Sequence, residues 1–284
     1  MARIVVPGLH QRVLLPAMKV LQLQLRQHDI ETGDTLPALC PNVTEDTLIQ
    51  DESGQIIGGY LTSLPERLAS LASIADVELR SSRVPKSLLE RAVKLQDVIA
   101  GKGGDARRVQ QYSAILGSIP PKVIMRRPYA TRSSVHAHES ARVFAKAMNA
   151  AGKEILKLIR SLDEGLYERH RDAVERHVPE RWRFGGLFSS TISNCNISAS
   201  VHRDNRNVKG AVNAIICKRR NAVGGRLHVP DYGATFEQGD GSLLVYPAWR
   251  NSHGVTPIVP THRGGYRNTL IWYALCGFEG GIAR

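Results

Sequence analysis

Residues 211–217 read Ala-Val-Asn-Ala-Ile-Ile-Cys, a run rich in apolar and β-branched residues that is typical of a strand buried in a sheet. Four further runs of this kind occur in the C-terminal part of the chain: Leu187–Ile192, Gly225–Val229, Ser242–Tyr246 and Asn268–Ala274. Gly, Asn, Asp and Pro residues lie between them. Many short strands separated by turn residues predict a sandwich, a barrel or a jelly roll over residues 184–278.

Upstream of these strands the sequence predicts helices and one hairpin. An apolar stripe at helical spacing predicts an amphipathic helix within residues 134–162; its members are Phe144, Met148, Ala151, Ile155, Leu158 and Leu162. Shorter helices are expected at 64–75 and at 86–100, the latter ending at the breaker stretch Gly101–Gly104.

The N-terminal third also contains a hairpin signal. The β-prone runs Thr47–Gln50 and Gln55–Ile57 flank the turn residues Asp51–Gly54. We therefore expect an α+β fold with two parts. An N-terminal α/β extension over residues 1–125 packs on a β-domain with a leading helix over residues 126–284.

Composition limits the classes of protein that fit. A hydrophobic content of 42% over 284 residues is ordinary for a globular protein, and no apolar run approaches the roughly 20 residues of a membrane helix. The N-terminus lacks a signal-peptide pattern, and the four cysteines form no C-x-x-C pair. We therefore expect a monomer in a reducing cytoplasm, which is a host cytoplasm if the protein comes from a phage.

The net charge of +12 is unevenly distributed along the chain. Residues 1–100 carry 10 basic and 12 acidic side chains, whereas residues 101–284 carry 28 and 14. A basic C-terminal part is suited to a polyanionic partner such as DNA, although many basic proteins never bind nucleic acid.

Three residues of the β-rich region have the composition of an iron site. His202 and Asp204 are two positions apart, and His253 follows 49 residues later. Two imidazoles and one carboxylate on one face of the metal are the ligands of non-haem Fe(II) oxygenases. Side chains two apart in a strand point to the same side, so His202 and Asp204 can bind one ion from a single short segment.

The same three letters occur a second time, at His170-Arg171-Asp172. That copy lies in a charged, helix-like stretch, where positions i and i+2 diverge by about 200° and do not share a metal easily. The sequence context therefore selects His202.

An arginine after the second histidine predicts the cosubstrate. Arg267 begins a strand-like run, and a guanidinium there can hold the distal carboxylate of 2-oxoglutarate through two hydrogen bonds. Arg263, ten residues after His253, is the alternate candidate.

The region around these residues resembles the TET (ten-eleven translocation) and J-binding-protein dioxygenases, including their phage and fungal relatives. His202–Asn207 is similar to the family's H-R-D-x-x-N signature, and Gly224–Pro230 is similar to its G-G-x-L-x-x-P hairpin. Gly239–Tyr246 and Arg267–Tyr273 resemble the strands that carry the second histidine and the oxoglutarate arginine. The zinc-binding cysteine pattern of animal TET enzymes is missing, which indicates the compact microbial form.

The resemblance implies a double-stranded β-helix (a jelly-roll or cupin-like fold) that uses Fe(II), 2-oxoglutarate and O2 to oxidise the 5-methyl group of a pyrimidine in DNA, 5-methylcytosine first. His202, Asp204 and His253 would be the catalytic metal ligands, Arg267 the cosubstrate clamp, and Asn207 the residue that hydrogen-bonds the target base. Basic candidates for contacts with the DNA backbone are Arg126, Arg127, Arg203, Arg206, Lys218, Arg219 and Arg220. For Lys218–Arg220 the alternative is a solvated hairpin tip.

Two other functions remain open from the sequence. The same metal core can serve a hydroxylase of a small molecule or of a protein side chain. Alternatively, the barrel can be a DNA-binding module without catalysis, in which the histidines are structural.

Overall fold

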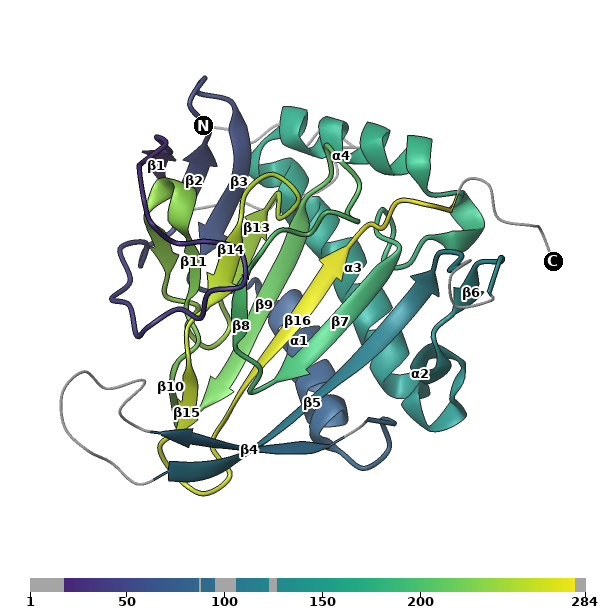
Figure 1. Ribbon diagram of the computed structural model, residues 1–284. Helices are drawn as coiled ribbons and strands as arrows, with labels where there is room; N and C mark the ends of the chain where they lie inside the picture. Colours follow the sequence, from purple (N-terminus) through teal and green to yellow (C-terminus); the bar gives the residue numbers. More distant parts are fainter. Residues whose placement is uncertain (1–17, 87, 95–105, 123–126, 279–284) are drawn as a thin grey trace, which may run out of the picture.

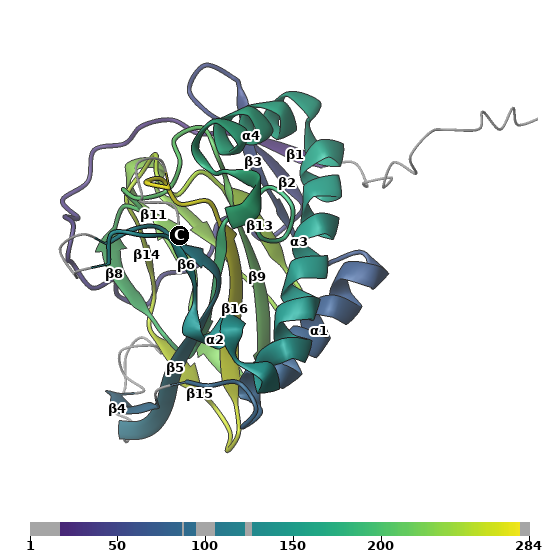
Figure 2. The same ribbon diagram turned by 90° about the vertical axis from the view of Figure 1, so that its right-hand side faces the viewer.

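The computed structural model describes residues 18–86, 88–94, 106–122 and 127–278. Its elements form three layers: helices, a large sheet and a small sheet (Figures 1 and 2). Among the described residues, no helix is long and apolar enough to cross a membrane.

The large sheet has ten strands. Across it they run in the order β1 (Lys19–Gln22), β2 (Thr47–Gln50), β3 (Ile56–Leu61), β13 (Leu243–Tyr246), β9 (Asn213–Arg220), β16 (Tyr266–Tyr273), β7 (Ser190–Cys195), β5 (Ala106–Ile119) and β4 (Leu89–Lys94), and β6 (Thr131–Arg132) pairs with β5. The pairing is antiparallel except between β1 and β2.

The small sheet faces the large one. Its order is β12 (Ala234–Phe236), β11 (Leu227–Val229), β14 (His253–Val255) and β8 (Ala199–His202). A further pair consists of β10 (Ala222–Gly224) and β15 (Ile258–Pro260). Figure 2 shows the two sheets on opposite sides of the molecule's centre, with the helices beyond the large sheet.

The three longest α-helices cover the outer face of the large sheet because each buries one apolar stripe. The α-helices are α1 (Glu66–Arg80), α2 (Ser134–Ala137), α3 (Arg142–Leu162) and α4 (Glu164–His177), and the short 3-10 helices are η3 (Glu139–Ala141), η4 (Glu180–Trp182) and η5 (Pro230–Tyr232). In α3 the predicted stripe is buried along its length. Asp163 ends α3 and begins α4, where its carboxylate accepts a hydrogen bond from the backbone N–H of Leu166.

Two apolar cores result. The larger lies between the helices and the large sheet, and Trp272 of β16 is buried in it. The smaller joins the sheets on the β2–β3–β13 side, where Tyr60 and Phe236 are in contact with ring centroids 6.0 Å apart. On the β16–β7 side the space between the sheets is not filled, and it contains the cavity described below.

The predicted mixed α+β fold is confirmed, and so are the hairpin at β2–β3 and the helix at α1. The five predicted C-terminal strands appear as β7, β9, β11, β13 and β16 with shifted ends. The helix predicted at 86–100 is wrong over Leu89–Lys94, which form β4 and pair with β5. Tertiary pairing there overrides a helical pattern of charges and aliphatic residues. The Gly101–Gly104 stretch lies outside the described residues.

The predicted boundary at residue 125 stays a prediction. Strands from both sides of it belong to one sheet, since β3 pairs with β13 and β5 pairs with β7.

Candidate metal centre and its pocket

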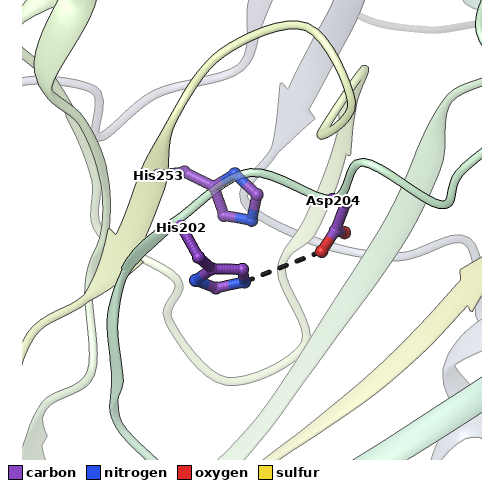
Figure 3. Close-up of side chains that lie close together, drawn as sticks. All are labelled: His202, Asp204 and His253. Carbon is purple, nitrogen blue, oxygen red and sulfur yellow. Dashed lines mark ion pairs between the residues drawn. The ribbon is translucent and has the colours of Figure 1, made fainter. Parts of the chain in front are cut away.

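His202 and His253 are brought together by the register of the small sheet. His202 is the last residue of β8, His253 is the first of β14, and the two are direct partners across the antiparallel pair. Their rings lie 4.5 Å apart between centroids, tilted by 53°. Figure 3 shows that both rings point toward the carboxylate of Asp204.

Asp204 reaches the same point from a turn rather than from the strand. The short segment that carries both residues is a strand only as far as His202, because β8 ends there. The backbone N–H of Asp204 donates to the carbonyl of Ala248, and the carbonyl of Asp204 accepts from the N–H of Asn207. The turn brings Asp204 Oδ1 to 3.6 Å from His202 Nε2.

One potential ligand atom from each of the three residues lies within 4.8 Å of the others. This is the only such cluster of three or more His, Cys, Asp or Glu side chains among the residues that the structure describes. His253 is buried, and that burial lowers its pKa although the charge of Asp204 raises it, so the ring is favoured in the neutral form that binds metal.

Hydrogen bonds fix which nitrogen of each histidine is free. His202 Nδ1 lies 2.8 Å from the carbonyl oxygen of Ser200, and His253 Nδ1 lies 3.2 Å from that of Asn251. A carbonyl oxygen only accepts, so each Nδ1 carries the proton and each Nε2 keeps its lone pair. Such partners orient metal-binding imidazoles in proteins.

The carboxylate of Asp204 is oriented in the same way. Its Oδ2 accepts hydrogen bonds from Asn207 Nδ2 and from Asn213 Nδ2, both at 3.1 Å. Asn207 Nδ2 also donates to Asn213 Oδ1 at 2.9 Å. With Oδ2 occupied by two amides, Oδ1 is left as the oxygen that faces the histidines.

Asn213 was not among the site residues predicted from the sequence. It is a buried polar residue in the otherwise apolar run 211–217, at the first position of β9. A polar residue inside a buried strand needs a partner, and that signal was available in the sequence.

A cavity of about 530 Å³ extends from the three residues between the sheets. Its walls are mostly apolar, for example Ile192, Leu227 and Ile271, and Arg267 lies at the end away from Asn213. A largely apolar cavity with a few convergent polar groups is the usual form of a small-molecule site.

Arg267 is 2% exposed, and burial lowers the pKa of its guanidinium. The guanidinium donates to Gln238 Oε1, and in the described part of the chain no carboxylate lies within ion-pair distance of it. Arg267 Nε and Gln238 Nε2 are buried donors without a hydrogen-bond partner. A buried cation beside two unused donors fits a carboxylate ligand.

Arg267 packs against Gly225, where any side chain would collide with it. Its φ is +73°, and a Cβ there would lie 2.3 Å from Arg267 Cδ. Gln238 was not singled out from the sequence; it has a φ of +50° in the turn before β13. Arg263 is exposed in the turn between β15 and β16 and does not line the cavity.

The basic residues singled out for DNA fall into separate groups. Arg203 and Arg206 are exposed and line the cavity beside Asp204. Lys218, Arg219 and Arg220 end β9, the strand that Asn213 begins, so roughly 20 Å of strand separates them from Asn213. Lys218 Nζ is paired with Asp240 Oδ2 at 3.1 Å. Arg127 donates to the carbonyl of Pro120, and Arg126 lies outside the described residues.

The second H-x-D triplet is structural. His170 lies in α4, as predicted for that stretch, is fully buried, and its Nδ1 accepts a hydrogen bond from the backbone N–H of Val212 at 3.1 Å.

No family model and no curated protein matches the sequence. Among solved structures, the chain is similar to NgTET1 in complex with 5mC DNA, with 14% identity, 93% of this chain and 84% of that chain covered, and a TM-score of 0.57. A 2OG-Fe(II) oxygenase family oxidoreductase from Burkholderia pseudomallei (15% identity, coverage 77% and 87%, TM-score 0.42) and a Pseudomonas putida prolyl-4-hydroxylase (12%, 75% and 89%, 0.33) are more distant. At these identities the likeness concerns the fold alone, and the chain has a fold similar to that of NgTET1.

Proposed function

We propose that the protein is an Fe(II)- and 2-oxoglutarate-dependent dioxygenase with a double-stranded β-helix core, and that it oxidises the 5-methyl group of a pyrimidine in DNA. One observation carries the proposal: two histidines with free Nε2 atoms and a carboxylate with a free oxygen converge in a cavity with a buried, unpaired arginine.

The residues present fit an iron ion and 2-oxoglutarate. His202, Asp204 and His253 would hold Fe(II), and Arg267 with Gln238 would hold the distal carboxylate of 2-oxoglutarate. Bound together with O2, these groups supply the oxidising power that converts a C–H bond into C–OH while 2-oxoglutarate becomes succinate and CO2. The chain's own part is to orient the ligands, to favour the neutral form of His253 and to surround the reacting carbon with apolar side chains.

DNA is favoured as the substrate by the charge of the C-terminal two-thirds and by Arg203 and Arg206 at the cavity. The fold similarity to NgTET1, which was solved with 5mC DNA, supports the same reading. A methyl group inside a duplex is out of reach of a metal in a cavity, so the base must be flipped out or unpaired.

Asn207 supports cytosine over thymine. Both hydrogens of its amide are used by Asp204 and Asn213, so only its Oδ1 is left to meet a base. An acceptor there matches the exocyclic amine of cytosine, whereas thymine presents an acceptor oxygen at that position. We therefore propose 5-methylcytosine as the preferred base.

The test uses iron-loaded protein, 2-oxoglutarate and ascorbate with methylated, thymine-only and unmethylated oligonucleotides, followed by mass spectrometry of the nucleosides. Oxidised 5-methylcytosine is expected, with succinate in proportion, and neither product from Asp204→Ala. If a peptide or a small metabolite gains oxygen and no nucleoside does, DNA is the wrong substrate. If no condition yields succinate, the protein is not a dioxygenase.

A further inference from the structure

A second pocket on the helix side of the large sheet is strongly basic. It has a volume of about 480 Å³, and Figure 2 shows the elements that form it, α2 and β6, toward the viewer and the start of α3 beside them. We call it the basic pocket and define it by its cationic and imidazole side chains: Arg132, His136, His138, Arg142, Lys146 and Arg183.

Arg132 is a half-buried lining residue of this pocket, and no acid among the described residues is paired with it. Its Nη1 donates to Ser118 Oγ at 2.6 Å and its Nη2 donates to the carbonyl of Arg181 at 2.7 Å. These partners are neutral. Burial lowers the pKa of Arg132, and no carboxylate among the described residues opposes this effect. The pocket is therefore electropositive below its surface as well as at its rim.

Few acids face the pocket. Glu139 lies in its wall and is exposed, and Glu175 is 3.6 Å from Arg183. Arg142 and Lys146 are exposed, one helical turn apart on α3, and neither forms an ion pair within the described ranges. Like charges at this spacing repel each other, so the pair stabilises the helix only when an anion lies between them.

The basic pocket and the cavity lie on opposite faces of the large sheet, and strand pairing relates one residue of each. Tyr273 lines the cavity and pairs with Ser190 of β7, which in turn pairs with Gly117 of β5. The next residue of β5, Ser118, pairs with Arg132. Three strand spacings place the backbone of Arg132 roughly 14 Å from the backbone of Tyr273 within the sheet. Along one strand of a duplex, that distance corresponds to about four nucleotides.

We propose that the basic pocket binds a phosphodiester of the same nucleic-acid strand whose base enters the cavity, a few nucleotides from that base. This inference rests on the proposed function for its substrate but uses different residues. Guanidinium groups bind phosphate oxygens through paired hydrogen bonds, and an ammonium adds a point charge. Such contacts are independent of base sequence and sensitive to salt.

The test compares two double variants on the same helix. Arg142→Gln/Lys146→Gln removes two charges from the pocket, and Lys153→Gln/Lys157→Gln removes two exposed charges at the same spacing farther along α3. Binding of a fluorescent, unmodified oligonucleotide to metal-free protein is measured at several salt concentrations, so no catalysis is involved. Inorganic phosphate and a mononucleotide are run as competitors.

The pocket variant should bind the oligonucleotide roughly tenfold more weakly at low salt, and the slope of log Kd against log salt should fall by about 2. The control variant should match the wild type. Equal losses in both variants, or no loss in either, would overturn the inference. So would phosphate binding that depends on Arg142 and Lys146 when oligonucleotide binding does not.

The binding experiment tests the phosphodiester site separately from the proposed dioxygenase function. If the pocket variant loses DNA affinity but the wild-type protein oxidises no nucleoside, the phosphodiester site stands and the dioxygenase substrate is wrong. If nucleosides are oxidised and the variant binds normally, only the phosphodiester site is wrong.

Discussion

At the scale of single residues, the sequence offers two arginines as candidates for the cosubstrate clamp, and the two lie in different environments. Arg267 is buried beside Gln238 in the cavity, and Arg263 is exposed in a turn outside it. We expect Arg267→Ala to raise the 2-oxoglutarate concentration needed for half-maximal succinate release by at least about thirtyfold, because loss of a buried charge-assisted pair costs about 2–5 kcal/mol. Arg263→Ala should leave it unchanged.

Thermal unfolding gives a readout of this prediction that does not need turnover. 2-Oxoglutarate should raise the Tm of the metal-loaded wild type and of Arg263→Ala, but not that of Arg267→Ala. Arg267→Lys keeps the charge and loses the paired hydrogen bonds, so it should lie between them. The reverse ranking of Arg263→Ala and Arg267→Ala would move the cosubstrate clamp to Arg263.

Asn213 is the second residue whose environment gives a prediction. Its amide holds Asp204 Oδ2 and leaves Oδ1 toward the histidines. Asn213→Ala should weaken Fe(II) binding by about 10–100-fold, as loss of a partner of a metal ligand usually does. Competition with a chelator measures this directly. Asn194→Ala is the control, since Asn194 lines the same cavity and has no hydrogen bond to the three ligand candidates. Equal iron affinity in the two variants would mean that Asn213 does not orient Asp204.

At the scale of elements, the contact between α4 and the start of β9 should make stability depend on pH. His170 of α4 accepts a hydrogen bond from the N–H of Val212, and burial lowers the pKa of His170 to about 4. The unfolded chain has a histidine pKa near 6.5, so protonation favours the unfolded state. The stabilisation is complete above about pH 6.5 and is lost as the pH falls toward 4, for a total of roughly 3 kcal/mol.

Urea unfolding at pH 7.5 and pH 5 checks this expectation. His170→Asn places an acceptor near the position of Nδ1 and removes the titrating group. The free energy of unfolding of the wild type should therefore fall more on acidification than that of His170→Asn. An equal fall in both would show that other groups control the acid sensitivity.

Element by element, the sequence predicted what depends on local pattern. The stripe of α3 and the short apolar strands follow from periodicity alone, and they were found. The strand β4 was missed because its conformation depends on pairing with β5, which no local pattern shows. The residue types and their spacing predicted the three ligand candidates, but their arrangement depends on non-local contacts: the two histidines are cross-strand partners, and a turn rather than a strand brings in Asp204. That turn depends on Ala248, more than forty residues away in the chain.

At the scale of the whole molecule, the part before residue 125 and the part after it depend on each other. β3 and β5 flank strands of the C-terminal part in one sheet. Arg250, in the segment before His253, is paired with Asp51 at 2.9 Å and with Glu52 at 2.9 Å, both in the β2–β3 turn. Burial raises the pKa of Asp51, but hydrogen bonds from Ser53 and Arg250 outweigh this effect and lower the pKa to about 2. The carboxylate is therefore charged at neutral pH, and its pair with Arg250 persists.

A split chain tests this dependence. Residues 126–284 expressed alone would leave β13 and β7 as open edges and remove the partners of Arg250, so we expect no cooperative unfolding transition and no stoichiometric Fe(II) binding. Co-expression with residues 1–125 should restore both, because the missing strands can pair in trans. The measurements are a thermal melt by circular dichroism and iron content after gel filtration. If residues 126–284 alone melt cooperatively and retain iron, the C-terminal part is an independent domain, and the N-terminal strands are an addition to a sheet that is already stable.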